Sequence, residues 1–309
     1  MPEPADISVA IEKPRELGAV RRFSHEAMAT VFEVYAVHPD AAYAAQAAQA
    51  AFDLTDRLER ELSRFLPNSD IARVNRLAAG DRTQVTPSTL ECLVIARHMF
   101  DLTGGAFDVS IGTGLPSLDL DADDCIVSAT KGGVQVDLGG VGKGYAVDLM
   151  AELLEEWGVQ RALVHGGFSS VLALDSPAGL AGWPLTLSDP TAPARILSRL
   201  SVRQTSLGAS GVRKKDHIRD PGTGEPARGR LAAWVVVPRP PPAAPVGDGP
   251  RVAPTAVADA LTTAFMLIST EEIEALCART PGLEAWLLPE PVGDSRAAPQ
   301  MLHFGGPAE

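Results

Sequence analysis

A glycine-rich stretch in the middle of the chain surrounds a lysine and could bind a phosphate group. Lys143 follows Gly140 and Gly142 and precedes Gly144. Apolar residues alternate with polar or small ones over 134–138, which is typical of a half-buried strand, and they recur at helical spacing after the glycines. A glycine turn between a strand and a helix lets the backbone approach a ligand, and the N-terminus of the helix offers unpaired N–H groups to an anion. The stretch is therefore either a phosphate site or a tight structural turn.

Two common phosphate-binding motifs do not fit this stretch. A P-loop needs glycine five residues before the Gly-Lys pair and Ser or Thr after it, but the chain has Asp137 and Gly144 at those places. A dinucleotide fingerprint needs Gly-x-Gly-x-x-Gly, and after Gly140 and Gly142 the third glycine comes one place early. We therefore expect neither motif.

A helix that we expect over 255–268 carries a carboxylate and a hydroxyl on one face. Asp259 and Thr263 stand at positions i and i+4, so they lie one turn apart. Oxygen ligands on a rigid helix suit a hard cation such as Mg²⁺. Alternatively, Asp259 complements the helix dipole and Thr263 bonds back to the helix backbone. The spacing by itself is compatible with both interpretations.

Two loops hold further residues that could contact a ligand. Phe107 and Asp108 stand side by side after a pair of glycines, where they could bind a ligand, or fill the core and cap the next turn. The residues at 220–224 have strong turn chemistry, which explains the Asp, Pro and Gly there. His217, just before them, has no comparably clear structural explanation.

The elements that must position these residues are a mixture of helices and strands. Asp40 can cap a long alanine-rich helix whose apolar stripe runs to Phe65, and Thr86 followed by Pro87 is typical of another helix start. A further helix follows the central glycines and reaches Trp157. The other expected helices cover 69–75, 86–104, 255–268 and 270–279, and the expected strands cover 23–37, 134–138, 161–165, 170–174, 198–209, 231–237 and 283–288.

The composition is that of a globular protein with a sizeable core. The chain has 309 residues, of which 45% are hydrophobic. A formal net charge of -12 argues against a nucleic acid or an anionic membrane as the main partner. There is no apolar run long enough for a transmembrane segment, and residues 1–20 lack the apolar core of a signal peptide.

Cysteines and prolines set two further expectations. Cys92, Cys125 and Cys277 are far apart and odd in number, so we expect reduced thiols rather than a disulfide framework or a metal pair. The segment 238–254 is rich in Pro, Ala and Gly and is interpreted as a long surface loop, because a boundary there would leave too few residues for a second domain.

Seven short segments, taken together, resemble in order the motif series of the FAD:protein FMN transferases, the ApbE-like family. The resemblance extends from about residue 20 to about residue 290, and it implies an N-terminal extension over 1–19 followed by a single domain over 20–309. The segments are Met28-Ala29-Thr30, 69–75, 104–108, 137–148, Ser210-Gly211, 217–224 and 258–264.

This resemblance implies both a fold and a reaction. The fold would be α+β, with mixed or antiparallel sheets flanked by helices and FAD in a central cleft. The reaction would be the Mg²⁺-assisted attack of a Thr or Ser hydroxyl of an acceptor flavoprotein on the FMN phosphorus of FAD, with release of AMP. Neutralising charge on the phosphoryl oxygens is what a metal, a lysine and a helix N-terminus can supply.

The matching positions also imply roles for individual residues. Asp259, Thr263 and the carbonyl of Gly142 would bind the metal, and His217 would act with Asp259 in catalysis, close to the attacking hydroxyl. The residues that would contact FAD are Met28, Ala106, Phe107, Asp108, Lys143 and Asp148.

The sequence departs from the family pattern at four places and leaves two other functions open. The segment between Gly211 and His217 is shorter than usual, Ala209 replaces a common Thr, Phe168 a common Asp, and Phe65 a bulkier aromatic residue. The alternatives to transfer are hydrolysis of FAD to free FMN and AMP, and flavin binding without chemistry. Because signal and lipid-attachment features of exported members are not seen, we expect action in the cytoplasm.

Overall fold

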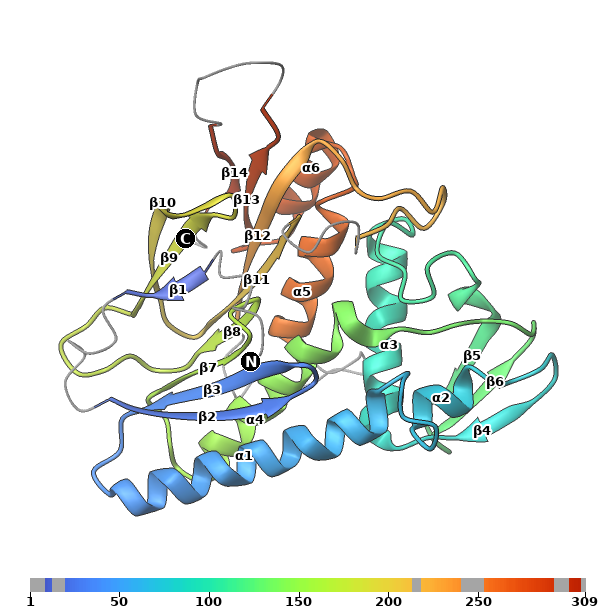
Figure 1. Ribbon diagram of the computed structural model, residues 1–309, viewed down its shortest axis with the longest axis horizontal. Helices are drawn as coiled ribbons and strands as arrows, with labels where there is room; N and C mark the ends of the chain where they lie inside the picture. Colours follow the sequence, from blue (N-terminus) through green and yellow to red (C-terminus); the bar gives the residue numbers. More distant parts are fainter. Residues whose placement is uncertain (1–8, 13–19, 213–217, 240–252, 292–299, 307–309) are drawn as a thin grey trace.

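The computed structural model describes residues 9–12, 20–212, 218–239, 253–291 and 300–306. In this part of the chain, the strands form one eight-stranded and two three-stranded sheets, and neighbouring strands in all three are antiparallel. Helices flank the sheets (Figure 1). The expected α+β class is thus confirmed.

The eight-stranded sheet is the middle layer of the molecule and has the order β14-β13-β12-β11-β8-β7-β3-β2. Its central strands β7 and β8 are buried along their whole length, so both faces of the sheet must be covered. The strands are β2 (Arg21–Ala27), β3 (Thr30–Ala36), β7 (Ala162–Gly166), β8 (Ser170–Ala173), β11 (Thr205–Gly211), β12 (Arg230–Pro238), β13 (Glu284–Pro289) and β14 (Leu302–Gly305).

Helices cover one face of this sheet and enclose the larger core. α4 (Gly142–Glu156) packs on β7 and β8, and α5 (Pro254–Ala264) packs on β11 and β12. The long α1 (Ala41–Leu62) lies along the edge formed by β2 and β3 (Figure 1). Asp40 starts α1, because its carboxylate accepts hydrogen bonds from the first free N–H groups of the helix, as predicted.

A small sheet covers the opposite face of the large one. It has the order β1-β9-β10, formed by β1 (Val9–Ile11), β9 (Trp183–Asp189) and β10 (Ala192–Val202). A second hydrophobic core fills the space between the two sheets, with Trp183 and Trp234 fully buried in it. The expected N-terminal extension therefore supplies a strand of this layer.

The remaining elements lie beside these layers. α3 (Pro87–Leu102) contacts α5 and β5 and begins at the predicted Thr86 cap, and α2 (Asp70–Val74) begins at Ser69. α6 (Thr270–Arg279) begins with a capping box and packs on β13 and β14. The third sheet has the order β4-β6-β5, with β4 (Arg82–Gln84), β5 (Leu118–Asp121) and β6 (Ile126–Ala129).

Two strand predictions were wrong in their local geometry. The segment 23–37 is a hairpin, because Met28 and Ala29 have φ of 49° and 57° and turn the chain between β2 and β3. The segment 134–138 has the predicted alternation of buried and exposed residues but forms no strand, because the backbone of Val136 pairs with the side chain of Asn75 instead. The chain then continues into a short 3₁₀ turn.

Other boundaries also differ from the prediction. Phe65 is 79% exposed and lies beyond the end of α1, so the apolar stripe stops at Leu62. The predicted strand over 198–209 is the end of β10 and most of β11, with Gln204 in a left-handed conformation between them. Helix α5 ends at Ala264 rather than at residue 268.

The cysteines and the helices agree with two further expectations. Cys92 and Cys277 are buried, Cys125 is half-buried, and all three are free thiols. None of the helices in the described residues is long and apolar enough to cross a membrane. Most of segment 238–254 lies outside the described residues; of its ends, Pro238 closes β12 and Pro254 opens α5.

Candidate active site

The carboxylate of Asp259 lies where α4, α5 and β8 meet. Its Oδ2 atom accepts a hydrogen bond from the backbone N–H of Gly144 at 2.9 Å and one from the Ser170 hydroxyl at 2.6 Å. The ammonium group of Lys143 is 4.0 Å from the same oxygen. The N-terminal turn of α4, with its backbone N–H and its lysine, and a hydroxyl of β8 therefore converge on one acidic side chain of α5.

Two glycines allow α5 to come this close to its neighbours. A Cβ atom on Gly144 would lie 2.6 Å from the carbonyl carbon of Thr255, and one on Gly208 of β11 would lie 2.6 Å from the carbonyl carbon of Ala258. Both distances are too short for a real side chain. Gly144 and Gly208 thus permit backbone-to-backbone packing that brings Asp259 onto the first turn of α4.

Hydroxyl pairs fix α5 on both sides of the close approach at Gly208. Ser206 and Thr255 share a hydrogen bond of 2.8 Å, and Ser210 donates to Thr262 at 2.9 Å. These two serines come from β11, at alternate positions that face the same helix. These contacts fix how α5 is shifted and rotated relative to β11, and they thereby fix the position of Asp259.

Asp259 has little positive charge close to it in the described residues. The side chain is only 5% exposed, and burial raises its pKa to about 6, against the lowering effect of Lys143, Ser170 and Gly144. A carboxylate that is buried without a close cation is costly, and binding a cation would offset that cost. The site is therefore suited to hold a positive ion.

The donor atoms around Asp259 fit Mg²⁺. All hydrogen bonds that its carboxylate accepts within the described residues go to Oδ2, which leaves Oδ1 available to a cation. The Thr263 hydroxyl lies on the same helix face and donates weakly to the Asp259 carbonyl at 3.3 Å. No cluster of three His, Cys, Asp or Glu exists in the described part of the chain, so a metal here would rely on Thr263, backbone oxygens, waters or substrate besides Asp259.

The first turn of α4 offers donors to an anion. Val141 precedes the helix and makes no side-chain cap. Free N–H groups at such a helix start attract phosphate groups. Lys143 donates to the carbonyl of Gly139 at 3.1 Å, so its ammonium group stays beside the turn η3 (Leu138–Gly140). The sequence left open whether the glycine-rich stretch is a tight turn or a phosphate site. In the structure it is a tight turn that also offers donors to a phosphate.

Phe107 lies against this turn, and both Phe107 and its neighbour Asp108 have structural roles. Phe107 is 2% exposed, and a Cβ atom on Gly140 would be 3.1 Å from its ring and 3.7 Å from the Thr263 hydroxyl. Asp108 accepts hydrogen bonds from the N–H groups of Ser110 and Gly112. The core-filling and capping alternative is thus observed, while the FAD contacts of Phe107, Asp108 and neighbouring Ala106 stay predictions.

Asp148 caps α5 from the neighbouring helix. Its buried carboxylate accepts three hydrogen bonds, two from the Thr255 N–H and one from the Ala256 N–H, with lengths of 3.0–3.1 Å. Burial, together with nearby Asp259, raises its pKa to about 7, although the backbone donors lower it. Asp148 holds α5 in place, and its direct contact to FAD stays a prediction.

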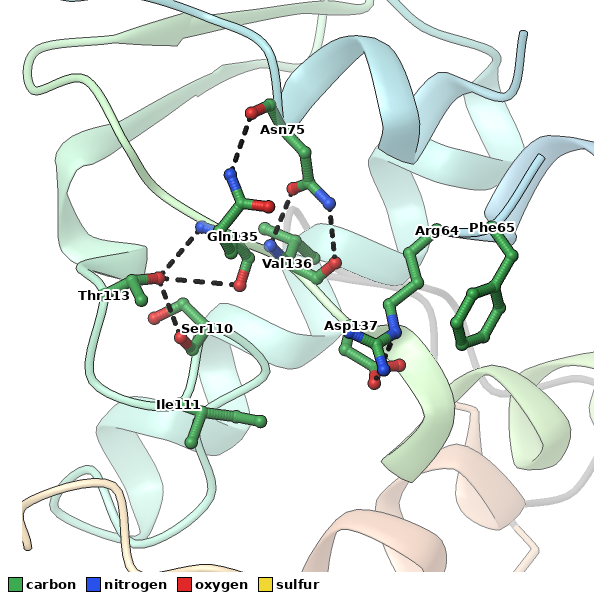
Figure 2. A pocket seen from close by; sticks show the side chains of 9 residues that line it. All are labelled: Arg64, Phe65, Asn75, Ser110, Ile111, Thr113, Gln135, Val136 and Asp137. Atoms are coloured by element: carbon green, nitrogen blue, oxygen red, sulfur yellow. Dashed lines mark hydrogen bonds and ion pairs between the residues drawn. The ribbon is translucent and has the colours of Figure 1, made fainter. Parts of the chain in front are cut away.

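A cavity of about 270 Å³ lies beside Asp137, the residue that precedes the η3 turn (Figure 2). Asp137 lines it just before the turn and forms an ion pair of 3.0 Å with Arg64. The Arg64 guanidinium also lies over the exposed ring of Phe65, 4.6 Å from its centre. The other residues around the cavity are Asn75, Ser110, Ile111, Thr113, Gln135 and Val136.

Of the remaining predicted site residues, two lie in the described part of the chain and one does not. Met28 is half-buried in the β2–β3 turn, and Gly142 is the first residue of α4. His217 lies outside the described residues. Sequence reasoning missed Ser170 and the Arg64–Asp137 pair; the pairing of Ser170 with Asp259 spans 89 residues and leaves no local signal.

Comparisons with known proteins identify a family and relatives of this chain. A sequence profile described as "ApbE family" matches residues 28–116 and 113–287. A protein from Klebsiella pneumoniae (strain 342) named FAD:protein FMN transferase is 24% identical over 282 residues, which is 78% of this chain and 75% of that protein. One of the same name from Treponema pallidum (strain Nichols) is 25% identical over 304 residues, 82% of this chain and 79% of its own length.

Solved structures share the fold. The flavin transferase ApbE from Vibrio cholerae superposes with a TM-score of 0.76 at 18% identity, over 92% of this chain and 97% of that one. The apo form of Pseudomonas stutzeri flavinyl transferase ApbE gives a TM-score of 0.76 at 21% identity, over 92% and 94% of the two chains. At such identities the likeness shows the fold.

Proposed function

The chain belongs to the ApbE family and is a flavin transferase, and we propose that it moves FMN from FAD to a Thr or Ser hydroxyl of an acceptor flavoprotein, releasing AMP. We also propose that the reaction requires Mg²⁺ held by Asp259, Thr263 and the carbonyl of Gly142. The observation that carries this proposal is the buried Asp259 carboxylate, which has one oxygen fixed by Gly144 and Ser170 and the other available.

The proposed step is a substitution at the FMN phosphorus. The acceptor hydroxyl oxygen forms a new P–O bond, the bond from this phosphorus to the oxygen of the AMP phosphate breaks, and AMP leaves with that bonding electron pair. A bound Mg²⁺ would neutralise charge on the pyrophosphate oxygens. Lys143 and the N–H groups at the start of α4 would bind the same phosphates; their common position beside one turn supports this proposal.

The hydroxyl proton needs a base, and we propose that His217 accepts it. A hydroxyl is a poor nucleophile at neutral pH, and a positioned imidazole contributes about 10²- to 10⁴-fold. The competing roles for His217 are a hydrogen bond to FAD or support of the turn at 220–224. His217→Ala should bind FAD nearly as well as the wild type but transfer FMN slowly, and the low-pH limb of the rate profile should be absent. Loss of FAD affinity with unchanged turnover at saturating FAD would make His217 a binding residue.

Mass spectrometry of a reaction mixture tests the function as a whole. The protein is incubated with FAD, Mg²⁺ and a candidate acceptor flavoprotein, and the mass of the acceptor and the free flavins are measured. Acceptor that carries FMN, with an equal amount of AMP, supports transfer. Free FMN and AMP with unmodified acceptor would identify a hydrolase instead. Replacing the target hydroxyl residue of the acceptor by Ala is the matched control.

A further inference from the structure

Ser170 lies on the helix-facing side of β8, in contact with Asp259. The residue is fully buried, and its hydroxyl makes the shorter of the two hydrogen bonds to Oδ2. The other donor, the N–H of Gly144, belongs to the backbone and cannot be removed by substitution. Ser170 is thus the one side chain in the described residues that donates a hydrogen bond to this carboxylate.

The sheet around Ser170 leaves space for this contact. Ser170 pairs with Gly166 of β7 and with Gly208 of β11, and directly opposed residues of antiparallel strands face the same side. Neither neighbour has a side chain, and α5 approaches the sheet at Gly208. Ser170 is therefore the only residue of this glycine–serine–glycine row with a side chain, and that side chain reaches Asp259.

We propose that Ser170 is a positioning residue of the cation site: it holds Oδ2 of Asp259 and so keeps Oδ1 available as a ligand. The inference rests on the proposed Mg²⁺ dependence and deepens it, because it names the residue that orients the proposed ligand. A carboxylate fixed by two donors on one oxygen has less freedom to rotate. Residues that orient a metal ligand in this way typically contribute 10- to 100-fold in metal affinity.

The neighbouring serine supplies a matched control. Ser169 carries the same hydroxyl one position earlier; it donates to the carbonyl of Gly166 at 3.3 Å and lies 3.5 Å from the Ser170 hydroxyl, but it makes no hydrogen bond with the carboxylate. Ser169 is the last turn residue before β8 and does not contact Asp259 by a hydrogen bond. Ser169→Ala removes a hydroxyl from the same region without removing a donor to Asp259.

The experiment measures metal binding directly. Mn²⁺, which prefers the same oxygen ligands as Mg²⁺, is titrated into the full chain with FAD present and no acceptor, and the free ion is counted by electron paramagnetic resonance. We expect Ser170→Ala to weaken Mn²⁺ binding 10- to 100-fold and Ser169→Ala to change it less than twofold. In turnover assays, Ser170→Ala should need 10- to 100-fold more Mg²⁺ for half-maximal rate and should recover most of kcat at saturation.

Asp259→Asn separates failure of this inference from failure of the proposed function. If Asp259→Asn binds Mn²⁺ like the wild type, the proposed metal ligand is wrong. If Asp259→Asn loses Mn²⁺ while Ser170→Ala binds normally, only the role of Ser170 is overturned, and equal losses in Ser169→Ala and Ser170→Ala overturn it as well. Should Ser170→Ala fold poorly, Ser170→Cys replaces it: the weaker thiol donor should give an intermediate affinity, and wild-type affinity would contradict the inference.

Discussion

Each face of the large sheet carries a buried carboxylate with polar and charged neighbours, and the two clusters differ in how completely the charge of the carboxylate is paired. The helix-side cluster is Lys143, Gly144, Ser170 and Asp259. The sheet-side cluster is Arg22, Glu33, Tyr35 and His165.

The sheet-side cluster is complete in itself. Glu33 accepts from Arg22 on one oxygen, and on the other it contacts the Tyr35 hydroxyl at 2.8 Å and His165 at 2.9 Å. Although burial raises the pKa of Glu33, the hydrogen bonds from His165, Arg22 and Tyr35 lower it to about 2. Phe168 stacks on the His165 ring, with centres 3.7 Å apart.

The helix-side cluster lacks such a partner. Asp259 has no cation closer than Lys143 at 4.0 Å within the described residues, and its pKa is raised rather than lowered. The comparison teaches that burial of a charge does not by itself mark a functional site. A buried carboxylate with one oxygen unpaired is the informative feature, since it needs a positively charged partner that the described residues do not supply.

Removing the carboxylate on the helix side should have the largest effect on activity. Asp259→Asn keeps the shape and an oxygen that can accept from Gly144 and Ser170, so the fold should be retained. Transfer should fall at least about 100-fold, because the loss of several kcal/mol of charge stabilisation corresponds to two or more powers of ten. The rate is measured at saturating Mg²⁺. Full activity under those conditions would remove Asp259 from the metal site.

Breaking the sheet-side cluster should change stability instead. Glu33→Ala leaves the Tyr35 hydroxyl and the His165 ring buried without their acceptor, which should lower the free energy of unfolding by about 3 kcal/mol. Urea denaturation measures the loss. Glu26→Ala, at an exposed position of the same hairpin, is the control and should stay within about 0.5 kcal/mol. A Glu33→Ala variant that is stable but inactive would contradict the assignment of stability to the sheet-side cluster and of activity to the helix-side cluster.

The contributions of Asp259 and Glu33 to the free energy of unfolding should also change with pH in opposite directions. Asp259 has a raised pKa of about 6, so the folded protein binds a proton that the unfolded chain has lost, and stability rises as the pH falls through 6 toward 3.8. Glu33 has a lowered pKa, so its contribution is present above pH 4.5 and is lost as the pH falls toward about 2.

Denaturation curves of metal-free protein check these signs. Any stability advantage of Asp259→Asn over the wild type should shrink between pH 7.5 and pH 5, because the wild-type carboxyl becomes protonated in that range. The advantage of the wild type over Glu33→Ala should shrink only below about pH 4.5. A pH-independent difference between Asp259→Asn and the wild type would show that Asp259 keeps an ordinary pKa.

The smallest effect is expected for the proline-rich segment between β12 and α5. Replacing residues 240–252 by a short Gly/Ser bridge should change the melting temperature and the FAD affinity little, since loop closure depends weakly on loop length. Both clusters should remain intact in this variant. A large fall in melting temperature, or loss of FAD binding, would instead assign the segment to the active site.

Helix starts were predictable from the sequence because their signals are local. Asp40, Ser69 and Thr86 each accept hydrogen bonds from N–H groups two or three residues further along the chain. The mixture of helices and strands and the spacing of Asp259 and Thr263 could be read in the same way, whereas the α+β class followed from the resemblance to the family. Such patterns require no knowledge of the tertiary structure.

What the sequence could not show depends on contacts between distant residues. The Val136 backbone pairs with the side chain of Asn75, so a strand-like pattern exists without a strand. Met28 adopts a left-handed conformation without being glycine, which hid the hairpin turn. Glu33 and His165 are 132 residues apart, and no local pattern connects them.

The cap that Asp148 provides to α5 has a consequence for how this protein can vary. An α-helix turns by about 100° per residue, so a shift of one residue at its start would rotate Asp259 away from α4. The first N–H groups of α5 bind a side chain of α4. The residue at which α5 starts is therefore fixed by this contact and not by the segment that precedes the helix. Insertions and deletions before Ala253 should therefore not misalign the Asp259 carboxylate, which makes this junction a place for evolutionary change and for grafting a reporter domain.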